Sequence, residues 1–167
     1  FGYPKLKGVF MSIWSGLSGG YVGATHHAIE DMALMRLIPG MAVLAPANSE
    51  DTAAATRAAY AYPGPVYIRI ATGMDPSGNE GNPFTLGKMA VTGEGTDATI
   101  IACGAQIAEA NRAARRLADD GIKTRVLYCH TIKPLDTAAV LAAAHQTGAI
   151  VTVEDHTTIG GLAGAVA

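Results

Sequence analysis

The apolar positions of the chain fall into short runs separated by polar or glycine-rich stretches. Mostly apolar runs at 7–13, 41–45 and 66–70 have the length and composition of buried strands. Between them, 28–37 carries apolar residues at helical spacing and 49–60 is alanine-rich. The order strand, helix, strand, helix, strand predicts an α/β layer with a parallel sheet and right-handed connections.

Capping residues predict where the two helices of this half begin. Thr25 is a candidate N-cap for the first helix, which would place His26 and His27 in its first turn, near free backbone amides. Ser49 is the candidate N-cap of the second helix, and two acidic residues follow it. Both assignments are local predictions that depend on the cap residue alone.

The second half of the chain repeats the alternation. The helix expected over 105–120 has one apolar stripe and one charged face, and Asp136 is the predicted N-cap of a helix that runs to Gln146. Strands are expected over 88–92, 98–102, 124–128 and 149–153. This half is therefore a second α/β unit.

A stretch rich in Gly and Pro, 73–83, separates the halves and contains almost no large apolar residue. It indicates a linker between domains, although a long surface loop within one domain has the same composition. The expected fold is α/β, with two three-layer modules and mostly parallel sheets. We expect a first domain at 1–72, a linker at 73–87 and a second domain at 88–167.

Composition excludes several classes of function. The 167 residues are 49% hydrophobic and carry a formal net charge of -2, which does not suggest a nucleic-acid surface. No apolar run approaches the ~20 residues that span a membrane. Cys103 and Cys129 lack metal-ligand spacing and end strand-like runs, so we expect small buried thiols in a reducing, cytoplasmic protein.

Both ends of the sequence lack the expected boundary features. The first residue is Phe1 rather than Met, and 160–167 looks like the opening of a helix without room for an average length of about 11 residues. We therefore expect a fragment or a partly ordered subunit.

Candidate chemistry concentrates in the segment 19–31, which combines loop glycines, two adjacent histidines and two carboxylates. His26 or His27 could exchange protons with a substrate hydroxyl or carbonyl, since imidazole titrates near neutral pH. The alternative is a histidine bonded to backbone at the start of a helix. Neighbouring helical residues point about 100° apart, so the pair is not expected to bind a metal ion.

Two further polar residues lie near strand ends. Arg69, late in the strand at 66–70, is a candidate for binding a carboxylate or phosphate, and a salt bridge that fixes the linker is an equal alternative. His156 follows the last strand and precedes Gly160-Gly161. It could line a second edge of a ligand site, although a role at the domain interface is favoured.

Four segments, taken together and in order, resemble a known family. The segments at 23–41 (Gly-Ala-Thr-His-His through Ile-Pro-Gly-Met) and 64–69 resemble the pyrimidine-binding domain of transketolases and of 1-deoxyxylulose-5-phosphate synthases. Those at 131–136 (Thr-Ile-Lys-Pro-Leu-Asp) and 151–162 resemble the C-terminal domain of the same enzymes. The resemblance covers nearly the whole chain and is strongest to the C-terminal subunits of split transketolases.

The resemblance implies thiamine diphosphate chemistry, in which a ketol or acyl unit passes from a ketone or 2-oxo donor to an aldehyde-type acceptor. In that family the cofactor lies between a pyrimidine domain and a diphosphate domain supplied by a partner. The partner would hold most of the diphosphate and the Mg²⁺, and the cofactor-activating Glu would lie upstream of Phe1. We therefore expect no metal ligands in this chain, activity only with the partner domain or subunit, and a homo- or hetero-oligomer.

The same resemblance implies roles for individual residues. His26 corresponds to the histidine that contacts the reacting region of the substrate, and it is the expected catalytic residue. The residues expected to bind substrate are His26, His27, Arg69 and Trp14, and those expected to bind the cofactor are Ser15 and Gly16.

Three departures from the family pattern bear on the substrate. Transketolases place a His at about Trp14, an Asp at about Val22 and an Arg for the sugar phosphate at about Thr72, and this chain lacks all three. We therefore hypothesise a substrate that is less polar than a sugar phosphate, or differently charged. Two alternatives stay open: a carboligase that decarboxylates 2-oxo acids, and a non-catalytic assembly subunit.

Overall fold

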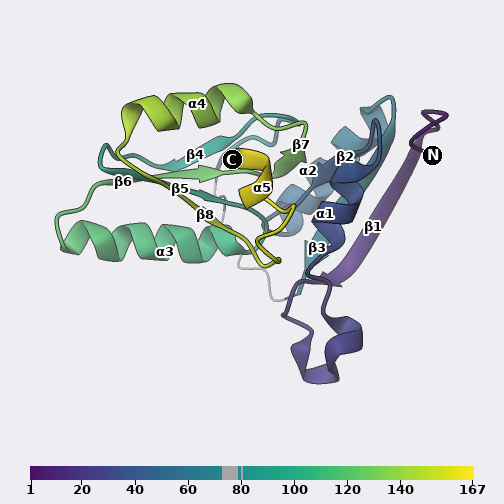
Figure 1. Cartoon of the computed structure of the whole chain (residues 1–167), viewed down its shortest axis with the longest axis horizontal. Helices are drawn as coiled ribbons and strands as arrows, with labels where there is room; N and C mark the ends of the chain where they lie inside the picture. Colours follow the sequence, from purple (N-terminus) through teal and green to yellow (C-terminus); the bar gives the residue numbers. More distant parts are fainter. Residues whose placement is uncertain (73–78, 80) are drawn as a thin grey trace.

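Two four-stranded sheets with flanking helices make up the protein (Figure 1), as seen in a computed structural model that describes residues 1–72, 79 and 81–167. Each sheet has two parallel pairs of strands and one antiparallel pair. The predicted α/β class with mostly parallel sheets is confirmed.

The first sheet has the strand order β1-β3-β2-β7. β1 (Gly8–Ser15) and β2 (Ala42–Leu44) both pair in parallel with the central strand β3 (Pro65–Ala71). The fourth strand, β7 (Thr131–Lys133), comes from the second half of the chain and pairs antiparallel with β2. The two halves of the sequence therefore share one sheet.

The helices of the first half correct two predictions. α1 covers only Asp31–Leu37, so a helix capped by Thr25 is wrong. α2 spans Ser49–Ala61 and is capped by Asn48, whose side-chain oxygen accepts a 2.9 Å bond from a backbone amide, so Ser49 is the first helical residue rather than the cap. No helix in the described residues is long and apolar enough to cross a membrane.

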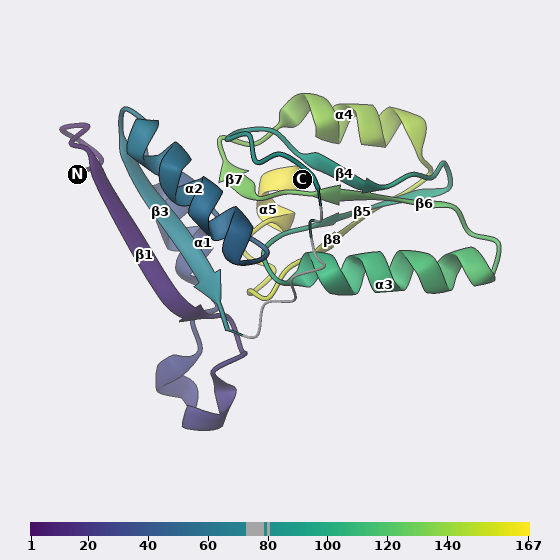
Figure 2. The same ribbon diagram turned by 180° about the vertical axis from the view of Figure 1, so that it is seen from behind.

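The second sheet has the order β4-β6-β5-β8, with β4 antiparallel and the other pairs parallel. Helix α3 (Gln106–Asp119) covers one face and α4 (Thr137–Gln146) the other, as Figure 2 shows. The short helix α5 (Ala163–Val166) contacts β8 of this sheet. The strands are β4 (Ala90–Gly93), β5 (Ala98–Ala102), β6 (Thr124–Tyr128) and β8 (Ile150–Val153). Asp136 caps α4 as predicted, through a bond from the amide of Ala139.

One apolar core joins the two sheets. Met32 and Val43 from the first half pack in the same cluster as Ile101 from the second. Cys103 and Cys129 lie inside this cluster as predicted, and burial raises the pKa of the Cys103 thiol to about 12. The two thiols are therefore neutral packing groups.

Polar contacts around β7 also join the two halves of the chain. The Lys133 ammonium donates 2.7 Å bonds to the backbone oxygens of Arg36 and Ile38 at the end of α1. Arg36 in turn donates to the oxygen of Gly161 at 2.7 Å. The predicted domain limits of 1–72, 73–87 and 88–167 stay a prediction, and 73–78 and 80 lie outside the described residues.

A buried histidine, His130, directly precedes β7. His130 is 1% exposed, its ring stacks on Phe84 at a centroid distance of 4.0 Å, and its Nδ1 lies 2.9 Å from the Thr131 hydroxyl. Burial lowers the pKa of His130 to about 4, although the nearby Asp51 opposes this shift. The imidazole is therefore neutral in the folded protein near pH 7.

Acid should destabilise the fold through His130. The folded pKa of about 4 lies below the ordinary value of 6.5, so only the unfolded chain gains a proton between these pH values. The free energy of unfolding should fall by roughly 3 kcal/mol as the pH drops from 6.5 to 4. Urea denaturation across this range measures the effect.

The variant His130→Gln should flatten this part of the stability profile, because glutamine does not titrate. His145→Gln, at an exposed position on α4, should keep the wild-type profile. Equal profiles for wild type and His130→Gln would show that His130 does not control the acid response.

Candidate active site

The segment 16–28 forms a loop that projects beyond the end of the first sheet (Figure 1). The pairing of β1 with β3 becomes irregular between Ser12 and Ser15, and Trp14 there has a φ of 62°, a strained value for a bulky residue. The loop is closed at its base, because the amide of Gly16 donates to the oxygen of Ala28 at 2.8 Å. Its ends are thus fixed while its tip extends outward.

His26 lies on this projecting loop with its side chain exposed. It ends the 3₁₀ turn η2 (Ala24–His26), and its Nδ1 lies 2.9 Å from the hydroxyl of Thr25. The ring lies 5.9 Å from that of Trp14, which also contacts Tyr21 at 6.1 Å. In the described part of the chain Nε2 has no hydrogen-bond partner, so this nitrogen can contact a ligand.

His27 is half-buried and lies against the same loop. Its Nε2 is 3.4 Å from the oxygen of Gly20, within the loop. The two histidines do not occupy the first turn of a helix, since η2 and the turn η1 (Gly20–Val22) precede an α1 that begins only at Asp31. The prediction that helical backbone amides surround them is therefore wrong.

Ser15 and Gly16, predicted to bind the cofactor, lie at the base of the loop. Ser15 is fully buried, and its hydroxyl is 3.3 Å from that of Ser12. Gly16 is also buried, against the carboxylate of Asp155. They support the loop from below, and their contact with a cofactor stays a prediction.

Arg69 is buried, and its guanidinium joins three segments of the chain. Its Nε lies 2.9 Å from the carboxylate of Asp31. Its Nη2 donates to the backbone oxygens of Ala28 at 3.0 Å and Asp155 at 2.7 Å. Arg69 therefore forms a salt bridge, but with Asp31 at the start of α1 rather than with a residue of the predicted linker. The predicted contact of Arg69 with substrate stays a prediction.

Asp31 receives further partners from both halves. The Tyr67 hydroxyl donates to it at 2.7 Å, and burial raises the pKa of this phenol to about 12, so it stays protonated. The fully buried ring of His156 lies 4.0 Å from Asp31 and accepts a bond from the amide of Ala33 at 3.4 Å. The favoured interface role of His156 is confirmed, whereas sequence reasoning assigned no role to Asp31 or Asp155.

The loop surface suits the aromatic part of thiamine diphosphate but not its diphosphate. Large apolar side chains are exposed on the loop and the end of β1, which is typical of a surface covered by a partner or ligand; they include Ile13, Trp14, Leu17, Tyr21 and Val22. No Lys or Arg occurs between Lys7 and Arg36. Such a surface can receive an aromatic heterocycle but lacks cations for a diphosphate.

The described residues provide no alternative metal site. In that part of the chain, no three His, Cys, Asp or Glu side chains come together as metal ligands would. These residues therefore do not form a site for Mg²⁺ by themselves.

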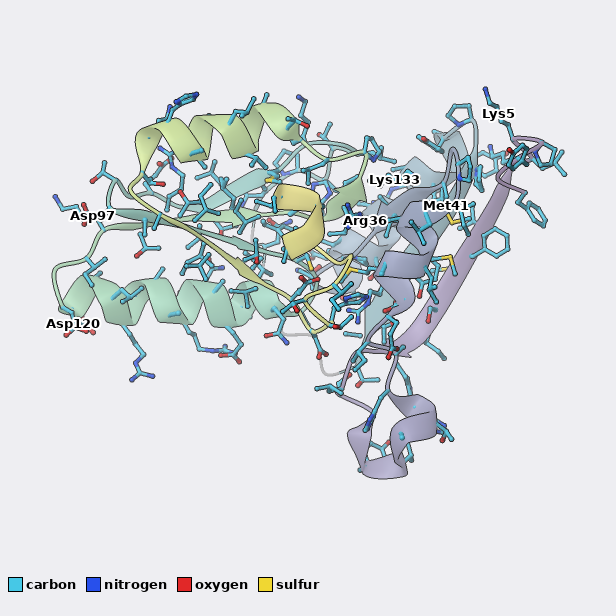
Figure 3. All side chains as sticks on the ribbon, in the orientation of Figure 1. Lys5, Arg36, Met41, Asp97, Asp120 and Lys133 are labelled. Carbon is cyan, nitrogen blue, oxygen red and sulfur yellow. The ribbon has the colours of Figure 1, made fainter. Side chains whose placement is uncertain are left out.

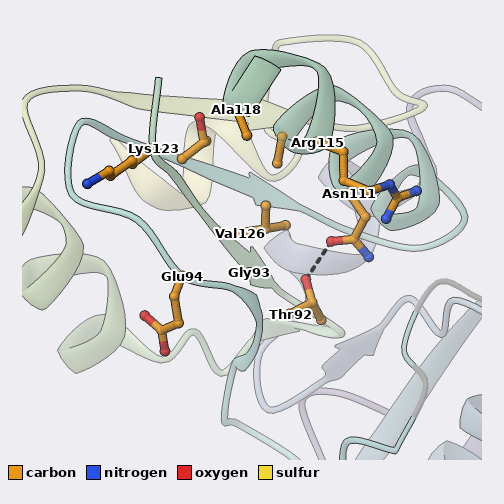
Figure 4. Close-up of a pocket in the computed structure, with 10 residues that line it drawn as sticks. Thr92, Gly93, Glu94, Asn111, Arg115, Ala118, Lys123 and Val126 are labelled. Carbon is orange, nitrogen blue, oxygen red and sulfur yellow. Dashed lines mark hydrogen bonds between the residues drawn. The ribbon is translucent and has the colours of Figure 1, made fainter. Parts of the chain in front are cut away.

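Several cavities lie on the surface of the described residues, and two of them bear on the site. One of about 210 Å³ lies near the loop and includes Ser18, Thr72 and Asp155 in its lining. Another of about 260 Å³ lies between α3 and the edge of the second sheet (Figure 4), where the Thr92 hydroxyl donates to Asn111 at 2.8 Å. Neither cavity contains a residue predicted to bind substrate or cofactor. The loop that carries His26 and His27 therefore stays the candidate site.

Two protein-family models match the chain over most of its length. Residues 3–74 match the pyrimidine-binding domain of transketolase, and 87–167 match the transketolase C-terminal domain.

Individual relatives agree with these models. The chain is 46% identical to "6-deoxy-6-sulfo-D-fructose transketolase subunit SqwH" of Clostridium sp. (strain MSTE9), over 91% of this chain and 48% of that protein. It is 39% identical to a subunit of the apulose-4-phosphate transketolase of Phocaeicola vulgatus, over 96% of this chain and 52% of that protein. The chain thus spans about half the length of the curated relatives it matches.

A solved structure shows the same fold. The structure titled "Split gene transketolase, inactive beta4 tetramer" superposes with a TM-score of 0.84 at 38% identity, covering 98% of this chain and 53% of that one. The similarity includes both sheets, since nearly the whole chain is covered.

Replacing Arg69 should show how much its ion pair with Asp31 contributes to the stability of the fold. Arg69→Met leaves the Asp31 carboxylate, which is 12% exposed, without its cation and should lower the free energy of unfolding by about 3–5 kcal/mol. Adding Asp31→Asn removes the uncompensated charge, so the double variant should be more stable than the sum of the two single losses implies. Urea denaturation of all four proteins gives the coupling, and additive losses would contradict the pairing.

Proposed function

Because the chain belongs to the transketolase family, we propose that it is part of a thiamine-diphosphate-dependent transferase that moves a ketol or acyl unit from a ketone or 2-oxo donor to an aldehyde-type acceptor. The observation that carries this proposal is the exposed imidazole of His26, held on a loop with a fixed base and flanked by exposed aromatic rings. Thiamine diphosphate, when bound, supplies the electron sink for this chemistry.

The chain's own residues perform positioning and proton transfer in this proposal. His26 donates or accepts a proton at a substrate hydroxyl or carbonyl oxygen through Nε2, while Thr25 orients the ring through Nδ1. Trp14 and Tyr21 provide an apolar wall that excludes water from one side of the reacting group. Ser15 and Gly16 support the loop where the cofactor's pyrimidine side would approach.

A companion subunit or domain completes the site. The lack of Lys and Arg between Lys7 and Arg36 supports binding of the anionic diphosphate by the partner. Oxygen ligands for Mg²⁺ do not cluster in the described residues, which supports binding of the metal ion by the partner as well. The related split transketolase whose structure is titled an inactive beta4 tetramer is consistent with a subunit that needs a companion. We infer a hetero-oligomeric enzyme with the active site between chains, located in the cytoplasm.

The substrate is proposed to carry an anionic group other than the usual sugar phosphate, or none. Trp14 lies beside His26 where transketolases place a polar residue, and Thr72 contributes no positive charge. Of the relatives quoted above, one is named for a sulfonated sugar and another for a sugar phosphate. Full-rate ketol transfer with ordinary pentose phosphates would contradict this part of the proposal.

The direct test combines the full-length protein with its companion subunit, thiamine diphosphate and Mg²⁺. His26→Ala should lower kcat by about 10²–10⁴-fold, as expected for loss of a proton-transfer group. His145→Ala, on the exposed face of α4, serves as the matched control and should retain the wild-type rate. A His26→Ala variant with unchanged turnover would indicate an assembly subunit without a catalytic role.

A further inference from the structure

Asp155 connects the second half of the chain to the base of the loop. It follows β8, and its two carboxylate oxygens lie 3.2 and 3.0 Å from the amide of Leu17. The bond spans 138 positions in the sequence, so it is a tertiary contact rather than a local turn. It fixes the start of the loop that carries His26.

Gly16 permits this contact. A Cβ atom at this position would lie 1.9 Å from Oδ2 of Asp155, and the residue has a φ of 83°. A side chain here would therefore displace the carboxylate and strain the backbone. The close approach of loop and carboxylate depends on a residue without a side chain.

The other end of the loop is held by the same segment. Arg69 donates both to the oxygen of Ala28, where the loop ends, and to the oxygen of Asp155. The amide of Thr157 donates to the oxygen of Ile29 at 2.9 Å. Residues 155–157 are therefore linked to both ends of the loop. Asp155 binds Leu17 at its start, and contacts through Arg69 and Thr157 reach its end.

From these contacts we propose that Asp155 is a positioning residue for the reaction: its carboxylate holds the Leu17 amide and thereby sets where the loop presents His26. This inference rests on the proposed function for its kinetic part, while the attachment of the loop can be measured without any substrate. In this proposal the second half of the chain contributes to the active site indirectly. It positions the loop and does not contact the substrate.

The first test is hydrogen–deuterium exchange in peptides from 16–28, using the full-length protein with its companion subunit. Asp155→Ala should increase exchange in these peptides, because Leu17 loses its acceptor and the loop base loosens. Asp155→Asn keeps one side-chain oxygen as an acceptor and should give an intermediate increase. Unchanged exchange in Asp155→Ala would overturn the proposal.

The matched control is Asp97→Ala. The Asp97 carboxylate also accepts a bond from a backbone amide, that of Lys123 at 2.7 Å, but at an end of the second sheet remote from the loop (Figure 3). This variant should leave exchange in 16–28 at the wild-type rate. An equal increase in both variants would indicate general loosening of the fold and would overturn the proposal.

The second test measures kcat and KM of the assembled enzyme. Asp155→Ala should lower kcat on the order of 10²-fold through misplacement of His26, and Asp155→Asn should recover part of the loss. Faster exchange with unchanged kinetics would contradict a positioning role. If wild type shows no thiamine-dependent turnover, the proposed function fails, and the exchange data alone then decide whether Asp155 holds the loop.

Discussion

The buried guanidinium of Arg69 is the constraint on which the arrangement of the two halves depends. Removing this charge from water is costly unless its donors are satisfied. Those donors meet Asp31 at the start of α1, the end of the projecting loop at Ala28, and the backbone at Asp155 after β8. Since these groups come from three separate segments, satisfying one side chain fixes how all three meet.

This constraint explains how a long loop can be both exposed and positioned. The base of 16–28 is tied by the Gly16–Ala28 bond and by contacts from 155–157, whereas its tip extends away from the sheets. An exposed imidazole is useful for proton transfer only if its location is reproducible. The fold places the rigid polar contacts below the loop and leaves the apolar and aromatic side chains free to meet another surface.

Much of the fold could be predicted because its strands are short apolar runs between helices with periodic patterns; α3 and β6 lie where these patterns place them. The beginning of α1 could not be predicted. The local capping signal of Thr25 is outweighed by closure of the loop through the bond between Gly16 and Ala28. The strand β7 has only three residues and lacks a pattern of its own.

The candidate site, like the fold, could be predicted from the sequence only in part. The exposed histidine could be selected from its position in a glycine-rich segment, together with a resemblance over four segments. The function of Arg69 stayed open between ligand binding and a salt bridge, because its partners lie 38 and 86 positions away. Contacts between residues so far apart in the sequence leave no local signal in a single sequence.

The most direct measurement is a structure of the protein assembled with its companion subunit, thiamine diphosphate and a substrate analogue. The account predicts that His26 Nε2 lies within hydrogen-bond reach, about 3 Å, of a substrate oxygen, at a boundary formed with the companion chain. A cofactor and analogue bound at a distance from the 16–28 loop, with His26 still facing solvent, would contradict it.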